Sequence, residues 1–351
     1  MKNFIEYFYN MRIDKIKYED KSYSFVYNGY LYKMYIYDNY GNVNFLLEVN
    51  KKLIGNTLMS EIISNRNGEI ISINNNIPYI LIRIYANGNK VISLEEISYL
   101  ANSLYKDKIQ INWGNLWSRK IDYLEDLINE NGKKYPIIVD SFNYFVGMAE
   151  NAISYYNNIV LENDYKYVVS HKVIRFDDTV EALYNPLNII FDYRARDVAE
   201  YLKISFFRNN YNVYYELDNY LKNSNLSLSE VKLLVARLLY PSFYFDMYED
   251  IIIDGKEEKI ILEVVTRLNE YEIYLSQIID YLRKVYGVDD VLWLKKRRIN
   301  WCINLHWLLL LFQGLHLLRL FQYHFLEYDL IMGNYYMLRL VLHKQHHFHI
   351  F

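Results

Sequence analysis

Residues 12–92 alternate apolar and polar positions in the way that is typical of β-strands. The run SYSFVYNGYLYKMYIY holds two such stretches, separated by Asn28-Gly29, a dipeptide typical of a tight hairpin turn. A second hairpin is expected where two apolar runs meet at Asn74-Asn75-Asn76. Between the hairpins, VNFLLEVNKKLIG (43–55) changes to helical spacing. We therefore expect two strand pairs with one helix between them.

From about residue 93 the pattern becomes mainly helical. Ser93 begins SLEEISYL, a sequence that predicts a capping box at a helix start. Two short apolar strands, YVVSH (167–171) and NIIFD (188–192), interrupt the helices. A strand-rich segment followed by helices predicts an α+β protein. The order of elements is that of a protein-kinase-like two-lobed fold, with a small β-rich N-lobe over residues 1–92 and a mainly helical C-lobe over residues 93–296.

Composition excludes several classes of function. The 351 residues are 52% hydrophobic and 23% charged, which is typical of a folded soluble protein with one large domain or two that pack together. A formal net charge of −3 gives no overall attraction to nucleic acid or to an anionic membrane, so neither is expected as a partner. The single cysteine, Cys302, excludes an intramolecular disulfide and a cysteine-based zinc site, and it favours synthesis in a reducing compartment. The N-terminus has no apolar segment long enough for a signal peptide.

Residue usage changes abruptly at about residue 297. Seven of the eight histidines and the only cysteine follow this point, whereas only two acidic residues do. One interpretation is out-of-frame translation after a frameshift. The alternatives are an amphipathic or membrane-touching extension around WLLLLFQGLHLLRLF and a metal-binding tail at HKQHHFH. We expect residues 297–351 to be an atypical tail, frameshifted or non-native, and assign it no function.

A kinase-type site needs a lysine on the phosphates, a glutamate that holds this lysine, an aspartate that orients the acceptor, and a second aspartate on the metal ion. Lys33 lies in the strand YLYKMYI, where the phosphate-contacting lysine would stand. Glu48, on the next helix, is its candidate partner, and Glu61 is a rival. All three also fit an ordinary solvated surface. No G-x-G-x-x-G motif precedes Lys33, and only Gly29 is present.

The segment VVSHKVIRFDDTVEALYNPLNIIFD contains the other candidates. His171 follows a short apolar strand, and Val173 stands two residues later, where the base should be. Valine has no group that accepts a proton. Asp178 stands where a metal-binding asparagine would be, and it also fits an ordinary loop aspartate. Asp192 ends the second strand and is the candidate metal ligand; the alternative is a structural carboxylate paired with an arginine of the RAR segment that follows.

Four segments carry a resemblance to a known family. SFNYFVGMAENAISYYN (141–157), DYRARDVAEYLK (192–203), RLLYPSFYFDMYE (237–249) and the hairpin of residues 65–85 resemble blocks of the YutH/CotS-type spore-coat proteins, relatives of the aminoglycoside-phosphotransferase-like kinases. The blocks occur in the family's order. The resemblance implies a kinase fold, synthesis in the mother-cell cytoplasm during endospore formation, and a place in the spore coat or on the spore surface beside other coat proteins.

Two main functions follow from this resemblance. The first is a catalytically inactive pseudokinase that acts as a structural or interaction component of the endospore. The second is an ATP-dependent phosphotransferase of the aminoglycoside- or choline-kinase-like type that acts on a small molecule or a coat protein, with ATP and Mg²⁺ as cofactors. A nucleotide-binding switch without turnover is a third interpretation. Val173 departs from the active relatives, and this departure favours the first.

Overall fold

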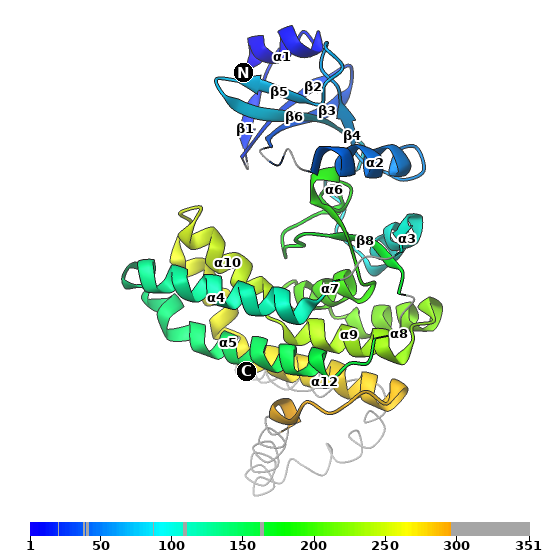
Figure 1. Cartoon of the computed structure of the whole chain (residues 1–351), viewed down its shortest axis with the longest axis vertical. Helices are drawn as coiled ribbons and strands as arrows, with labels where there is room; N and C mark the ends of the chain where they lie inside the picture. Colours follow the sequence, from blue (N-terminus) through cyan, green and yellow to red (C-terminus); the bar gives the residue numbers. More distant parts are fainter. Residues whose placement is uncertain are drawn as a thin grey trace, which may run out of the picture. The chain divides into compact units, whose positions relative to one another are not determined.

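The computed structural model describes residues 1–295, apart from residues 20, 38, 40–41, 87, 108–110 and 162–164 (Figure 1). The chain forms two compact units, Met1–Val265 and Thr266–Phe351. The boundary expected between residues 92 and 93 lies inside the first unit, so this division into lobes stays a prediction. The atypical tail expected at residues 297–351 lies outside the described residues.

The N-terminal part of the first unit is an antiparallel sheet with one helix before it and one within it. Its strands follow the order β1-β2-β3-β6-β4, and β5 also pairs with β6. The elements are α1 (Lys2–Tyr9), β1 (Lys17–Glu19), β2 (Ser22–Tyr27), β3 (Tyr30–Ile36), α2 (Val43–Leu53), β4 (Glu61–Ile63), β5 (Ile71–Asn74) and β6 (Ile77–Ile84). The predicted strand pairs and the helix between them are confirmed.

Both predicted hairpins turn at residues with left-handed backbone. Asn28 and Gly29, with φ of 49° and 80°, join β2 to β3, and Asn75 and Asn76, with φ of 49° and 63°, join β5 to β6. Asparagine and glycine adopt this conformation more readily than other residues. Because β2 and β3 pair in register from Ser22 opposite Tyr35 to Tyr27 opposite Tyr30, the first turn fixes which strand residues share a face.

The alternation along β3 and β6 gives the sheet two apolar faces. One face packs Met34 and Leu81 against residues of α1, and the other packs Ile80 and Ile82 against Leu46 of α2. Lys33 lies opposite Ile82 in the strand register, so it belongs to the face that α2 covers. Partly buried Leu187, from the later part of the chain, also packs against this face.

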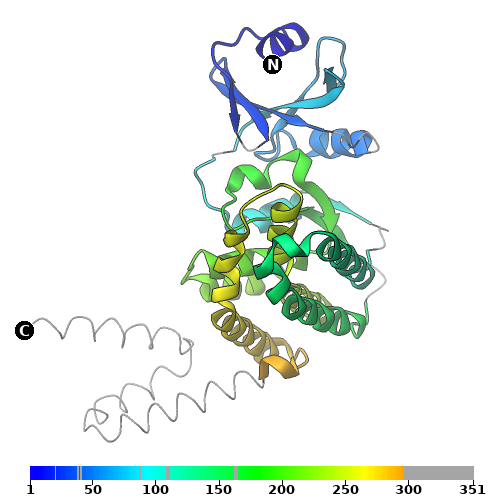
Figure 2. The ribbon, with the colours of Figure 1, turned by 90° about the vertical axis from the view of Figure 1, so that its left-hand side faces the viewer.

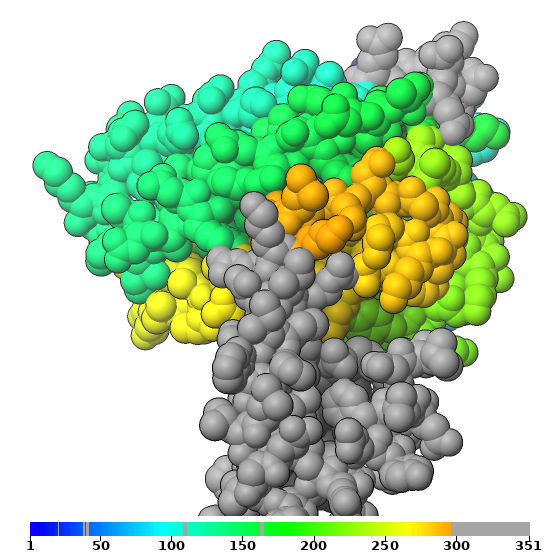
Figure 3. All heavy atoms as spheres, turned by 90° about the horizontal axis from the view of Figure 1, so that it is seen from below, coloured from blue at the N-terminus to red at the C-terminus, as the bar shows by residue number. Residues whose placement is uncertain are grey.

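The rest of the first unit is mainly helical. Its longer helices are α3 (Leu94–Ser103), α4 (Trp113–Asn131), α5 (Pro136–Asn157), α7 (Ala195–Phe207), α8 (Val213–Ser224), α9 (Leu228–Leu239) and α10 (Ser242–Ile252). The helices α4 and α5 lie side by side in Figure 2 and form a continuous surface in the space-filling view of Figure 3. The helix α7 is buried on nearly all sides and packs against α3 and α9. The expected α+β class, with a β-rich start and a helical remainder, is confirmed.

The predicted capping box at Ser93 forms only in part. The Ser93 side chain accepts a hydrogen bond from the Glu96 N–H, as predicted, but the Glu96 carboxylate bonds to Lys90 and to the Tyr184 hydroxyl, so the capping box is only half formed. A complete box occurs at Ser227 and Glu230, where α9 begins.

A small three-stranded sheet, in the order β7-β8-β9, connects the helices. It consists of β7 (Tyr105–Lys106), β8 (Tyr167–His171) and β9 (Ile189–Asp192). The two strands predicted from YVVSH and NIIFD are therefore β8 and β9, and they pair antiparallel. Between them lie the short helix α6 (Val180–Leu183) and the 3₁₀ turn η3 (Pro186–Asn188). His171 pairs with Ile189, and Asp192 pairs with Val168, so the two candidates lie at opposite ends of this hairpin.

In the second unit, α12 (Leu268–Tyr286) ends at Gly287, whose φ of 72° is the left-handed C-cap conformation that glycine provides. The first unit ends with η4 (Glu258–Ile261) and most of α11 (Leu262–Thr266). Across the described residues, no helix is both long and apolar enough to span a bilayer.

Candidate kinase-type site

His171 is a buried side chain whose two ring nitrogens are both engaged. Its Nδ1 lies 2.6 Å from Oδ2 of Asp197, and its Nε2 lies 2.9 Å from the carbonyl oxygen of Leu183. The backbone N–H of His171 donates to the other oxygen of the same carboxylate at 3.2 Å. Asp197 belongs to the first turn of α7, so this histidine connects the end of β8 to that helix. The imidazole therefore acts as a structural link.

The backbone of Val173 is held by the side chain of Asn188. Its N–H donates to Oδ1 of Asn188 at 3.2 Å, and its carbonyl accepts from Nδ2 of Asn188 at 2.9 Å. Arg196 holds the preceding residues, because it donates to the carbonyl oxygens of His171 and Lys172 at 2.8 and 2.7 Å. The loop is thus fixed by an amide and a guanidinium, and a valine side chain stands where a proton acceptor was expected.

Asp178 lies in a turn and faces a different cavity from Val173. Its carboxylate accepts the N–H of Arg175 at 2.7 Å, and its carbonyl accepts from Arg208. Burial, with a smaller contribution from the neighbouring Asp177 charge, raises the pKa of Asp178. It lines a cavity of about 470 Å³, whereas Val173 lines a separate cavity of about 160 Å³. The structure therefore does not place these two candidates in one cavity.

Asp192 is 3% exposed, and protein donors occupy both of its carboxylate oxygens. Oδ1 accepts the Trp113 indole N–H at 3.0 Å and the backbone N–H of Tyr193 at 2.7 Å. Oδ2 accepts from Arg196 at 2.9 Å. Burial raises the pKa of Asp192, and the charges of Arg196 and Arg237 oppose this rise. These contacts are the ones expected of the structural carboxylate that the sequence offered as the alternative to a metal ligand.

Lys33 and Glu48, the candidate pair of the small lobe, do not meet. Lys33 forms an ion pair with Glu181 of α6. Glu48 bonds to Lys52, one turn along its own helix, at 2.8 Å, and it lies 3.7 Å from Lys106. The rival partner, Glu61, is also engaged elsewhere, with Arg83 and Tyr85.

Mg²⁺-ATP does not fit these residues as they stand. A divalent cation needs free carboxylate or carbonyl oxygens, and those of Asp192 already accept three donors. The ammonium group of Lys33 already faces a carboxylate. Nowhere in the described part of the chain do three or more histidine, cysteine, aspartate or glutamate side chains form a group able to hold a metal ion.

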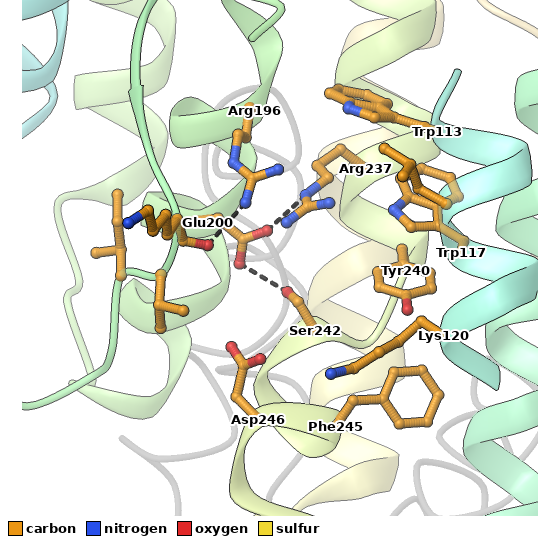
Figure 4. Close-up of a pocket in the computed structure, with 14 residues that line it drawn as sticks. Trp113, Trp117, Lys120, Arg196, Glu200, Arg237, Tyr240, Ser242, Phe245 and Asp246 are labelled. Carbon is orange, nitrogen blue, oxygen red and sulfur yellow. Dashed lines mark hydrogen bonds and ion pairs between the residues drawn. The ribbon is translucent and has the colours of Figure 1, made fainter. Parts of the chain in front are cut away.

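The cavity beside Val173 contains a buried charged cluster that the sequence did not reveal (Figure 4). Glu200 accepts from Lys203 at 3.0 Å, from Nε of Arg237 at 2.6 Å and from the Ser242 hydroxyl at 2.7 Å. Burial opposes ionisation of Glu200, but the charges of Lys203 and Arg237 outweigh it and lower its pKa to about 2. A glutamate and a lysine three residues apart on a helix with apolar neighbours, as in AEYLKI, were the available signal.

Aromatic rings enclose the arginine of this cluster. The guanidinium of Arg237 lies 5.6 Å from the ring centre of Trp113, 5.8 Å from that of Trp117 and 5.7 Å from that of Tyr240. The rings of Trp117 and Tyr240 stack at 4.5 Å. Such cation–π contacts stabilise a desolvated cation. The cluster holds α4, α7 and α9 together at the edge of the cavity.

Comparisons with known proteins agree with this architecture. The family model described as "Spore coat putative kinase YutH" matches residues 2–281. The endospore coat-associated protein YutH of Bacillus subtilis (strain 168) is 27% identical over 209 residues, which are 52% of this chain and 61% of that protein. The chain thus matches about three fifths of this relative's length.

Solved structures give the fold. An aminoglycoside phosphotransferase from Alicyclobacillus acidocaldarius superposes with a TM-score of 0.56 at 10% identity, covering 81% of this chain and 97% of that chain. An AMP-bound spectinomycin phosphotransferase gives 0.47 at 10% identity, covering 80% and 94%. The first likeness confirms the kinase-like fold that the order of strands and helices predicted.

Proposed function

Because the chain belongs to the spore coat putative kinase YutH family, we propose that it is a kinase-fold component of the endospore coat that does not transfer phosphate. It would act as a structural or interaction component, with other coat proteins as partners. Synthesis in the mother-cell cytoplasm and deposition in the coat or on the spore surface form part of the proposal. The name of the Bacillus subtilis relative, an endospore coat-associated protein, supports the location.

The engagement of Asp192 is the observation that carries the inactive assignment. In a kinase-type site this carboxylate would hold the metal ion that neutralises the developing charge. Here one indole N–H, one backbone N–H and one guanidinium N–H satisfy its two oxygens inside a buried setting. Freeing them would leave the Trp113 indole N–H and Nη1 of Arg196 without this acceptor, at about 1–3 kcal/mol for each unsatisfied group. Val173 adds to this because it supplies no base.

Turnover is the direct test. The full chain is incubated with Mg²⁺-ATP, and released ADP and phosphate are measured over a range of pH. We expect no product above that of a matched Asp192→Asn preparation. Product formation by the native chain that this substitution abolishes would show an active phosphotransferase and overturn the proposal.

The location has a separate test. A tagged copy of the chain, produced from its own promoter in its spore-forming host, is followed through spore fractionation. We expect it in the coat extract and not in the core fraction. Recovery in the core alone would exclude the proposed place.

A further inference from the structure

The segment from Thr179 to Tyr184, which contains α6, bonds at several points to residues of the N-terminal part of the first unit. The N–H of Val180 donates to the carbonyl of Lys90 at 2.8 Å, and Thr179 forms an antiparallel bridge with Val91. At the other end, the Tyr184 carbonyl accepts the N–H of Ser60 at 2.9 Å. Figure 1 shows α6 next to α2 and the sheet. Contacts at both ends thus fix the position of the short helix between them.

The side chain of Tyr184 strengthens this attachment. Its hydroxyl donates to the Glu96 carboxylate at 2.6 Å, and the residue is 1% exposed. Lys90 also pairs with Glu96, so the Glu96 carboxylate bonds both to the segment before α3 and to the residue that follows α6. The segment is therefore held by backbone and side-chain bonds together.

Glu181 projects from this segment to Lys33. The two side chains form an ion pair and are only 15% and 26% exposed, so solvent screens the pair less than it would a surface pair. The other carboxylate oxygen of Glu181 comes close to Gly88, where a Cβ would lie only 3.0 Å from it. Because Gly88 has no side chain, the Glu181 carboxylate can occupy this position.

We propose that Thr179–Tyr184 is an intramolecular latch, in which the Glu181 carboxylate takes the place of an anionic ligand on Lys33. The proposal rests on the kinase-fold assignment and explains how the chain can keep a lysine in this strand while nucleotide binds there only weakly. A carboxylate tethered in this way acts at a local concentration of roughly millimolar or above. A phosphate-bearing ligand must displace it and disturb the backbone bonds on either side.

The expected size of the effect follows from the population of open molecules. If the latch is open in about 1% of molecules, the apparent affinity of a ligand for Lys33 falls about 100-fold. Glu181→Gln removes the charge but keeps the size of the side chain, so it should recover a large part of this factor. Binding should not need Mg²⁺, because the oxygens of Asp192 remain engaged.

The experiment measures ATP binding to the full chain by calorimetry, with EDTA and then with Mg²⁺. The variants are Glu181→Gln, Tyr184→Phe, which loosens the latch without touching the ion pair, and the double variant Lys33→Met with Glu181→Gln. Glu257→Gln is the control, since Glu257 pairs with Lys259 at a site where both side chains are about 70% exposed. We expect Glu181→Gln to bind at least 10-fold more tightly than the native chain and the control, Tyr184→Phe to lie between, and the double variant to lose the gain.

Three results would overturn the latch. The first is that the native chain and Glu181→Gln bind ATP with equal affinity. The second is that Glu181→Gln or Tyr184→Phe binds no ATP. The third is that the double variant with Lys33→Met keeps the increased ATP affinity of Glu181→Gln. None of these results bears on turnover. The proposed function fails if the native chain forms product or is recovered in the spore core alone, and neither result is among the three above, so the two failures can be told apart.

Discussion

Glu200→Gln tests whether the buried charged cluster depends on one carboxylate. Lys203 is 0% exposed and Arg237 is 6% exposed, and both donate to Glu200. The substitution keeps the shape of the side chain but leaves the buried Arg237 guanidinium facing a neutral amide, and it removes the Glu200 charge that opposes the lowering of the Lys203 pKa by burial. Removing one partner of a buried ion pair costs about 3–5 kcal/mol, because the remaining charge stays desolvated. We expect Glu200→Gln to lower the free energy of unfolding by this amount at neutral pH.

The pH dependence gives the prediction a second signature. Since the folded pKa of Glu200 is about 2 and its ordinary value is 4.5, the folded state binds fewer protons than the unfolded state between these values. The contribution of ionised Glu200 to the free energy of unfolding is therefore present above pH 4.5 and is lost as the pH falls toward 2. The difference corresponds to about 3 kcal/mol at 1.36 kcal/mol per pH unit. Glu200→Gln should lack this part of the acid destabilisation.

Urea unfolding of the full chain and its variants, followed by tryptophan fluorescence at pH 7 and through the acid range, measures both effects. Trp113 and Trp117 lie beside the cluster and report its opening. Glu257→Gln, which breaks an exposed pair, should change stability by no more than about 0.5 kcal/mol. If Glu200→Gln costs less than about 1 kcal/mol, or shows the native acid slope, the cluster does not depend on Glu200 as argued.

Three further predictions concern single sites. Asp192→Asn should destabilise the chain by about 2–4 kcal/mol, since the amide cannot match the carboxylate toward Arg196; an unchanged urea midpoint would contradict its structural role. Gly29→Ala should lower the free energy of unfolding by about 1 kcal/mol, because alanine disfavours a φ of 80°. Gly147→Ala is the control, because a Cβ added at Gly147 also meets open space. Burial and the Glu200 charge raise the pKa of Asp246 from 3.8 to about 6, so stability should fall as the pH rises between these values, and Asp246→Asn should abolish this fall and stabilise the chain at pH 7.

Local features of the fold were predictable because short segments determine them. The Asn28-Gly29 turn and the alternation along its two strands are contained in 16 consecutive residues, SYSFVYNGYLYKMYIY, so the hairpin and its two faces followed from the pattern. The half-formed capping box at Ser93 shows the limit of such signals. The Glu96 carboxylate has partners at Lys90 and at distant Tyr184, and these tertiary contacts replace the local bond.

Side-chain pairs between residues far apart in the sequence were not predictable in the same way. Lys33 and Glu181 are 148 positions apart, and Trp113 and Asp192 are 79 apart, so no periodic pattern connects them. Glu48 is different, because Lys52 follows it by one helical turn. A glutamate four residues before a lysine favours a local pair, and this signal was present in the sequence.

The proposed absence of phosphate transfer has three physical grounds. Val173 stands where the proton acceptor was expected and has no lone pair, protein donors bond to both oxygens of Asp192, and Glu181 forms an ion pair with Lys33. The first two share Arg196, which bonds to the loop carbonyls and to the Asp192 carboxylate, whereas Asn188 holds the loop separately and the ion pair of Lys33 involves neither residue. Restoring any one group would therefore leave the other two obstacles in place. Under the proposed function, Asp192, Arg196 and Lys33 contribute to the stability of the fold instead of to phosphate transfer.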